Sequence, residues 1–79
     1  MYYTYILQSQ KDRTFYVGVT DDLRKRIREH NSGKTRYTSS RMPYELIWYC
    51  AFMDKKRAYD FEKYLKSGSG NAFFKKRLI

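Results

Sequence analysis

The sequence predicts a small α+β fold, in which a three-stranded, mainly antiparallel sheet is flanked by helices in the order β-β-α-β-α-α. Three observations lead to this prediction. Residues 2–8 alternate between the two faces of a strand, and a polar turn separates them from a second short apolar segment. Two later segments, 22–31 and 55–66, carry apolar residues at helical spacing. With 79 residues, the chain is expected to form a single domain over 1–79.

The first two predicted strands form a hairpin. The turn "SQKDRT" (9–14) joins residues 2–8 to "FYVGVT" (15–20). Gly18 stands in the middle of the second strand and has no side chain, so we expect a backbone or a phosphate to approach the sheet there. Tyr16 and Gly18 point the same way, so the glycine is expected to clear space beside the Tyr16 phenol. A simple bulge is the alternative.

A helix is expected next, capped by Asp21 or Asp22 and running to about Asn31, where "NSGK" ends it. Residues 32–43, "SGKTRYTSSRMP", read as a basic, hydroxyl-rich loop that ends at the only proline of the chain.

The second half begins with the most apolar strand, "YELIWYCAFM" (44–53). Asp54 is expected to cap a helix over 55–66, with Gly68 near its C-terminal end. "NAFFKKRLI" (71–79) is expected to form a short terminal helix.

Charge is the strongest feature of the composition. Seventeen Lys and Arg against eight Asp and Glu give a net charge of +9. Such an excess favours a polyanionic partner, nucleic acid above all, although a solvated basic surface is the alternative. No membrane association is expected, because no basic amphipathic helix is present. A single cysteine, Cys50, and the lack of a signal peptide favour the cytoplasm.

Two predicted helices each aim a charged residue inward. Arg26 flanks the apolar side of its helix, and Glu62 falls among the apolar residues of the second helix. A buried Arg26–Glu62 ion pair would explain both, but so would a pocket in which the arginine holds an anion and the glutamate a metal. His30 lies on the same side as Arg26, either as a hydrogen-bonded core residue or as part of that pocket. Zinc chemistry is not expected, because the chain has one histidine and its cysteine lies on another element.

Two short segments resemble the half-motifs of the GIY-YIG nuclease superfamily. They are "TYI" (4–6) and "YVG" (16–18), with Tyr5 and Tyr16 eleven residues apart. The first half-motif departs from the pattern because it has no glycine before Tyr5.

The resemblance continues through both predicted helices. "DLRKRIREHNSG" (22–33) puts Arg26 ten residues after Tyr16, and "RAYDFEKYLK" (57–66) puts Glu62 where such nucleases carry a metal-binding glutamate. It is closest to small stand-alone bacterial proteins similar to the nuclease domain of the excision-repair incision subunit.

The resemblance implies a metal-dependent DNA endonuclease or nickase, with a possible place in DNA repair or recombination. Arg26 and a Mg²⁺ or Mn²⁺ ion on Glu62 would hold the scissile phosphate. Tyr16 is assigned as the base and Tyr5 as its hydrogen-bond partner, an assignment that could be reversed. His30 would orient a group or relay a proton.

Further residues are expected to contact the nucleic acid, largely through its backbone. They are Gly18, Lys34, Arg36, Arg41, Asn71, Lys75, Lys76 and Arg77. Two other function classes stay open: a catalytically silent nucleic-acid-binding module and a protein-interaction domain that uses the aromatic surface.

Overall fold

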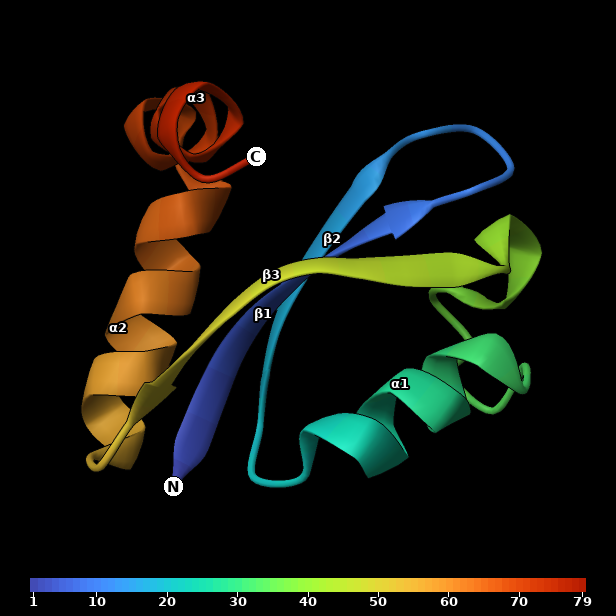
Figure 1. The fold of residues 1–79 in the computed structure, drawn as a ribbon, viewed down its shortest axis with the longest axis horizontal. Coiled ribbons are helices and arrows are strands. Elements are labelled where there is room, and N and C mark those ends of the chain that lie inside the picture. Colours follow the sequence, from blue (N-terminus) through green and yellow to red (C-terminus); the bar gives the residue numbers. More distant parts are fainter.

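The computed structural model describes all residues, 1–79, and confirms the α+β order (Figure 1). The strands form one antiparallel sheet in the order β2-β1-β3. The elements are β1 (Tyr2–Ser9), β2 (Phe15–Thr20), α1 (Leu23–Asn31), the 3₁₀ turn η1 (Ser39–Arg41), β3 (Tyr44–Phe52), α2 (Lys55–Lys66) and α3 (Gly68–Arg77).

Side-chain caps set the starts of the first two helices. Asp22, rather than Asp21, accepts a hydrogen bond from the Lys25 amide at 3.1 Å and caps α1. Asp54 accepts from the Lys56 amide at 2.9 Å and caps α2, as the sequence predicted. At the other end of α1, Gly33 adopts a φ of 81°, a left-handed conformation that favours glycine.

The junction of α2 and α3 differs from the sequence prediction. α3 begins at Gly68, not near residue 71, and the cap of α2 is Ser67, directly before the glycine that was expected near this end. Ser67 serves both helices instead: its hydroxyl donates to the Tyr64 carbonyl at 2.6 Å and accepts from the Gly70 amide at 3.1 Å. One extended residue therefore ends α2 and starts α3, which leaves no linker between them.

One face of the sheet packs against α2 and α3, at the left of Figure 1. β3 contains a β-bulge, because Ile6 pairs with Trp48 while Leu7 pairs with Leu46, so that Ile47 is the extra residue. Ile47 packs against the core on this face. The buried members of this core cluster are Ile6, Val17, Leu65 and Phe74.

The other face packs against α1, which lies at the lower right of Figure 1. Tyr5, Leu7 and Tyr44 are its buried apolar residues, and Leu23 and Ile27 of α1 pack on them. Alternate residues of β1 thus belong to two different cores, so both faces of this strand are covered.

The loop over 32–43 is held down at both ends. The Asn31 side chain donates to the Tyr44 carbonyl at 3.0 Å and accepts from the Tyr44 amide at 2.6 Å. The Ser9 hydroxyl donates to the Arg41 carbonyl at 2.7 Å. These hydrogen bonds therefore attach the loop to the sheet.

None of the helices has the length and apolar composition needed to cross a bilayer.

The α2–α3 junction yields a stability prediction. A methyl group on Gly70 would overlap the backbone of Tyr64 and Leu65, whereas one on Gly68 would meet no atom within 4 Å. We expect Gly70→Ala to lower the free energy of unfolding by about 1–3 kcal/mol or more. Gly68→Ala, the matched control, should leave it unchanged or raise it by up to about 1 kcal/mol. Urea unfolding measures both, and equal effects would contradict the close junction.

Candidate active site

Two tyrosines and a histidine form an aromatic cluster on the α1 face of the sheet. The rings of Tyr5 and Tyr16 lie 6.3 Å apart between centroids. The His30 ring, from α1, lies 6.0 Å from Tyr5 and 4.8 Å from Tyr16. Tyr5 is 1% exposed, whereas Tyr16 is only partly buried. Of the two phenols, Tyr16 is therefore the one nearer to solvent.

Gly18 makes room for this cluster in a different way from the one expected. The register pairs it directly with Tyr5. A Cβ atom there would lie 2.5 Å from the Tyr5 hydroxyl and 3.1 Å from Cε2 of Tyr16. The space over Gly18 is thus filled mainly by Tyr5, so it is not left open beside Tyr16 for a phosphate. The β1–β2 register has no shift, so the bulge alternative is wrong.

A hydrogen-bond chain runs from Tyr5 into the basic loop. The Tyr5 hydroxyl lies 2.9 Å from Nε2 of His30, and Nδ1 of His30 lies 2.8 Å from the Thr38 hydroxyl. The Thr38 hydroxyl in turn donates to the Thr35 carbonyl at 3.4 Å. Because that hydroxyl has one proton, it accepts from Nδ1, which leaves Nε2 to accept from Tyr5. This chain fits a neutral imidazole with a neutral phenol as donor.

Burial sets the protonation of both partners. It lowers the pKa of His30 to about 4, an effect to which the positive charge of Arg26 adds. Burial also raises the pKa of Tyr5 to about 12, although the neighbouring Arg26 opposes the rise. At pH 7 both side chains are therefore neutral. His30 is a hydrogen-bonded core residue, one of the two alternatives from the sequence, and it is also a member of the aromatic cluster.

The Arg26–Glu62 ion pair considered from the sequence does not form. Arg26 pairs with Glu29 at 3.2 Å, and its side chain is 35% exposed. Glu62 pairs with Lys66 at 3.1 Å, and its side chain is 20% exposed. Each charge is matched one turn away on its own helix. Even so, Arg26 lowers and Glu62 raises the pKa of the same phenol, Tyr5, so both charges lie near enough to act on it.

A mainly apolar cavity of about 610 Å³, called the aromatic cavity here because four aromatic rings line it, opens beside Tyr16. Its lining residues are Phe15, Tyr16, Val17, Tyr37, Leu65, Lys66, Asn71 and Phe74. Asn71, which was predicted to contact the nucleic acid, thus lines the same cavity as Tyr16. Tyr37 is 74% exposed, and its ring lies 5.9 Å from that of Tyr16.

Lys66 is a site residue that the sequence reasoning missed. Its ammonium lies 6.0 Å from the centre of the Tyr16 ring and also binds Glu62, so it connects these two residues. The signal was present in the sequence, because Lys66 stands four residues after Glu62, the spacing of a helical ion pair.

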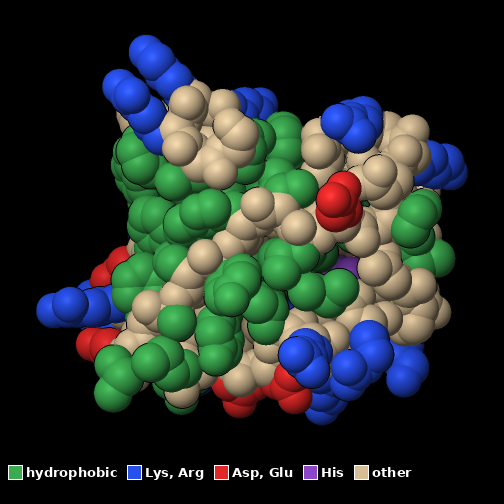
Figure 2. Space-filling view, in the orientation of Figure 1, with side chains coloured by type: hydrophobic (Ala, Val, Ile, Leu, Met, Phe, Trp, Pro, Cys, Tyr) green, Lys and Arg blue, Asp and Glu red, His purple; other side chains and the backbone are tan.

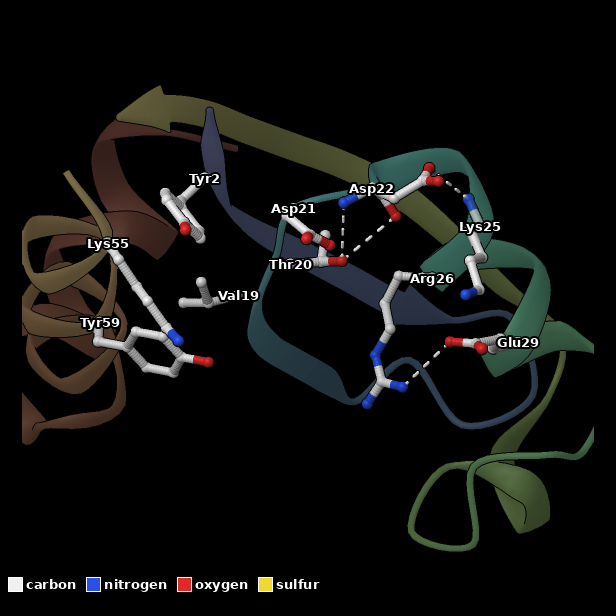
Figure 3. Close-up of a pocket in the computed structure, with 10 residues that line it drawn as sticks. All are labelled: Tyr2, Val19, Thr20, Asp21, Asp22, Lys25, Arg26, Glu29, Lys55 and Tyr59. Atoms are coloured by element: carbon white, nitrogen blue, oxygen red, sulfur yellow. Dashed lines mark hydrogen bonds and ion pairs between the residues drawn. The ribbon is translucent and has the colours of Figure 1, made fainter. Parts of the chain in front are cut away.

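A second, polar cavity of about 360 Å³ lies beside Arg26 (Figure 3). Lys25, Arg26 and Glu29 of α1 line one wall, and Lys55 and Tyr59 of α2 line the other. Lys55, Tyr59, Glu62 and Lys66 recur every three or four residues, so they lie along one side of α2. That side of α2 faces both cavities.

Lys and Arg side chains lie at several separate places on the face shown in Figure 2, and the predicted backbone-binding residues come from different elements. Lys34 and Arg36 are both exposed in the loop, and Arg41 pairs with Asp12 at 3.5 Å. Lys75 lies over the Phe15 ring at 5.5 Å, which brings it to the rim of the aromatic cavity. Lys76 and Arg77 are exposed at the end of α3.

The family model for the GIY-YIG catalytic domain matches residues 1–77, and the chain belongs to this nuclease family. Within the family it is similar to small UPF0213 proteins. It is 42% identical over 66 residues to one from Lacticaseibacillus paracasei, covering 82% of this chain and 73% of the relative. It is 46% identical over 66 residues to one from Lactococcus lactis, covering 82% and 62%.

A solved relative agrees with the fold. The solution NMR structure of a UPF0213 protein from Bacillus halodurans superposes with a TM-score of 0.59 at 35% identity, covering 96% of this chain and 84% of that one. The chain spans 62–73% of the length of the relatives from L. paracasei and L. lactis.

Buried His30 should make stability depend on pH. Its ordinary pKa is 6.5 and its folded value about 4, so the unfolded chain gains a proton first as the pH falls. The neutral His30 therefore contributes fully to the free energy of unfolding above about pH 6.5. This contribution, about 3 kcal/mol in all, is lost as the pH falls towards 4. Urea unfolding between pH 7 and 4.5 measures this loss.

His30→Gln is the control, because it cannot titrate in this range and should flatten the dependence. An NMR titration of the imidazole in the wild-type protein should give a pKa near 4. A pKa near 6.5, or an unchanged slope in the variant, would contradict the burial argument.

Proposed function

We propose that this protein is a metal-dependent DNA endonuclease that nicks a phosphodiester bond by attack of water. The observation that carries the proposal is the surroundings of Tyr5. A guanidinium, a carboxylate and a second phenol all lie close enough to influence the pKa of this one buried hydroxyl. They come from α1, α2 and β2, three separate elements. Phosphodiester hydrolysis needs an anion holder, a metal ligand and a base, and this arrangement offers one of each.

Arg26 is proposed to hold the scissile phosphate. Its ion pair with Glu29 is more than a third exposed on the arginine side, so the guanidinium can exchange a carboxylate for a phosphate at modest cost. A guanidinium donates two parallel hydrogen bonds to such an oxyanion. The cavity of Figure 3 gives the phosphate access to it.

Glu62 is proposed to hold Mg²⁺ or Mn²⁺. A carboxylate is the hard oxygen ligand that Mg²⁺ takes, and this ion is usually bound by one or two carboxylates while water and phosphate oxygens complete its shell. The partly exposed Glu62 fits that pattern, with Lys66 as the cation that balances it here. When bound, such a metal polarises a phosphoryl oxygen and favours hydroxide over water.

Tyr16 is proposed as the base and Tyr5 as its positioning partner. Tyr5 is fully buried, and its hydroxyl is already engaged with His30. Tyr16 is partly exposed and has the Lys66 ammonium over its ring. The Tyr16 oxygen would accept the proton of the attacking water as the new P–O bond forms and the bond to the leaving nucleotide breaks.

The second candidate is a nucleic-acid-binding module without catalysis. It is favoured by one observation: Arg26 and Glu62 are each neutralised within their own helix.

For the nuclease, we further propose a place in the cytoplasm, where Cys50 would stay a thiol, and a role in DNA repair or recombination.

Nicking of a supercoiled plasmid tests the proposal. We expect relaxation with Mg²⁺ or Mn²⁺, none with EDTA, and none with Arg26→Ala. Tyr16→Phe removes one hydroxyl and keeps the ring, and it should lower the rate about 10²–10⁴-fold. The matched control is Tyr37→Phe, on the neighbouring ring, which should nick normally. A wild-type rate from Tyr16→Phe would move the base to Tyr5 or His30.

Glu62 gives a separate prediction. Because Glu62 does not pair with Arg26, Glu62→Gln removes one partly exposed ion pair and should change stability by less than about 1 kcal/mol. Nicking should nevertheless collapse, and Mn²⁺ should no longer raise the melting temperature. Asp60→Asn removes the equivalent pair with Lys56 on the outer side of α2 and should leave both intact. If Glu62→Gln keeps the nicking activity, Glu62 does not hold the metal.

A further inference from the structure

The outer side of α1 carries a polar groove that the proposed mechanism does not use. Its volume is about 310 Å³, and no apolar side chain lines it. Its lining residues are Lys25, Arg28, Glu29, Ser32 and Lys34. The four helical and capping positions recur at three- and four-residue steps, so they form one stripe along the helix.

The positive charge in this groove is not compensated. None of the chain's four ion pairs includes Lys25, Arg28 or Lys34. The one carboxylate in the lining, Glu29, already binds Arg26. Like charges three and four residues apart on a helix destabilise it slightly. No ion pair within the folded chain balances these charges, so an external anion is the ligand that they would bind.

The groove continues from the candidate active site. It shares Lys25 and Glu29 with the cavity of Arg26, shown in Figure 3. From residue 25 to residue 32 the stripe extends about 10 Å along the helix. That length spans about three base-pair steps of one DNA strand. Figure 2 shows basic side chains gathered over α1, at the lower right.

We propose that this groove is a second phosphate-binding site, in which Lys25, Arg28 and Lys34 hold the DNA backbone next to the nucleotide at Arg26. The ligand class rests on the proposed function. The contact is to phosphate alone, because flexible ammonium groups and an exposed guanidinium on the outside of a helix read no base edge. The groove therefore positions the strand that enters the cleft and adds no sequence preference.

Salt-dependent DNA binding tests the groove. Lys25→Gln/Arg28→Gln removes two exposed, unpaired charges. Arg57→Gln/Lys63→Gln removes two equally unpaired charges from the outer side of α2 and is the matched control. Binding to a labelled duplex of about 20 base pairs is followed by fluorescence anisotropy in EDTA, so no cleavage occurs. The slope of log K against log salt should become shallower by about 1.8 for the first variant, about 0.9 for each lost contact, and change far less for the control.

The two proposals fail in different ways. Equal slopes in both double variants would mean that only net charge matters and would overturn the groove, even if the wild-type protein nicks plasmid. A shallower slope confined to Lys25→Gln/Arg28→Gln would support the groove, even if no nicking were found. In a protein that nicks, the same variant should raise KM and leave kcat near the wild-type value.

Discussion

The buried hydrogen bond between Tyr5 and His30 is the contact on which the rest of the site depends. It joins the central strand to α1, and through Thr38 it also fixes the basic loop. Because both groups are buried and fully paired, neither can turn away without leaving a polar atom unsatisfied. The glycine at position 18 follows from it, since any side chain there would displace the Tyr5 hydroxyl. The partly exposed Tyr16 then packs against this buried, hydrogen-bonded pair.

Periodicity made most of the fold predictable. Strand and helix patterns gave β2 and α2 their bounds, and Asp54 its cap, because these features depend on neighbours in the sequence. The bulge at Ile47 and the double role of Ser67 were out of reach, because each depends on what packs against it. The amino-acid composition of a turn such as "KSGSG" (66–70) does not reveal which of its residues is extended.

The candidate site was predictable in its members and less so in their contacts. A helical projection gives the direction of Arg26 and of Glu62, but not the distance between two helices, so it left open an ion pair that does not form. The same projection placed His30 inside, yet its neutrality depends on complete burial and on the charge of Arg26. Lys66 was overlooked because the family pattern names only its partner, Glu62.

The shared residue between α2 and α3 has a consequence for how such a protein can diversify. α2 carries Glu62 and Lys66, α3 carries Asn71, and Ser67 and Gly70 lock the two helices into one rigid bracket. Both helices line the aromatic cavity, together with β2 and Tyr37, so the angle of the corner helps to set its width. A change at the corner would resize the cavity while every lining side chain stayed the same.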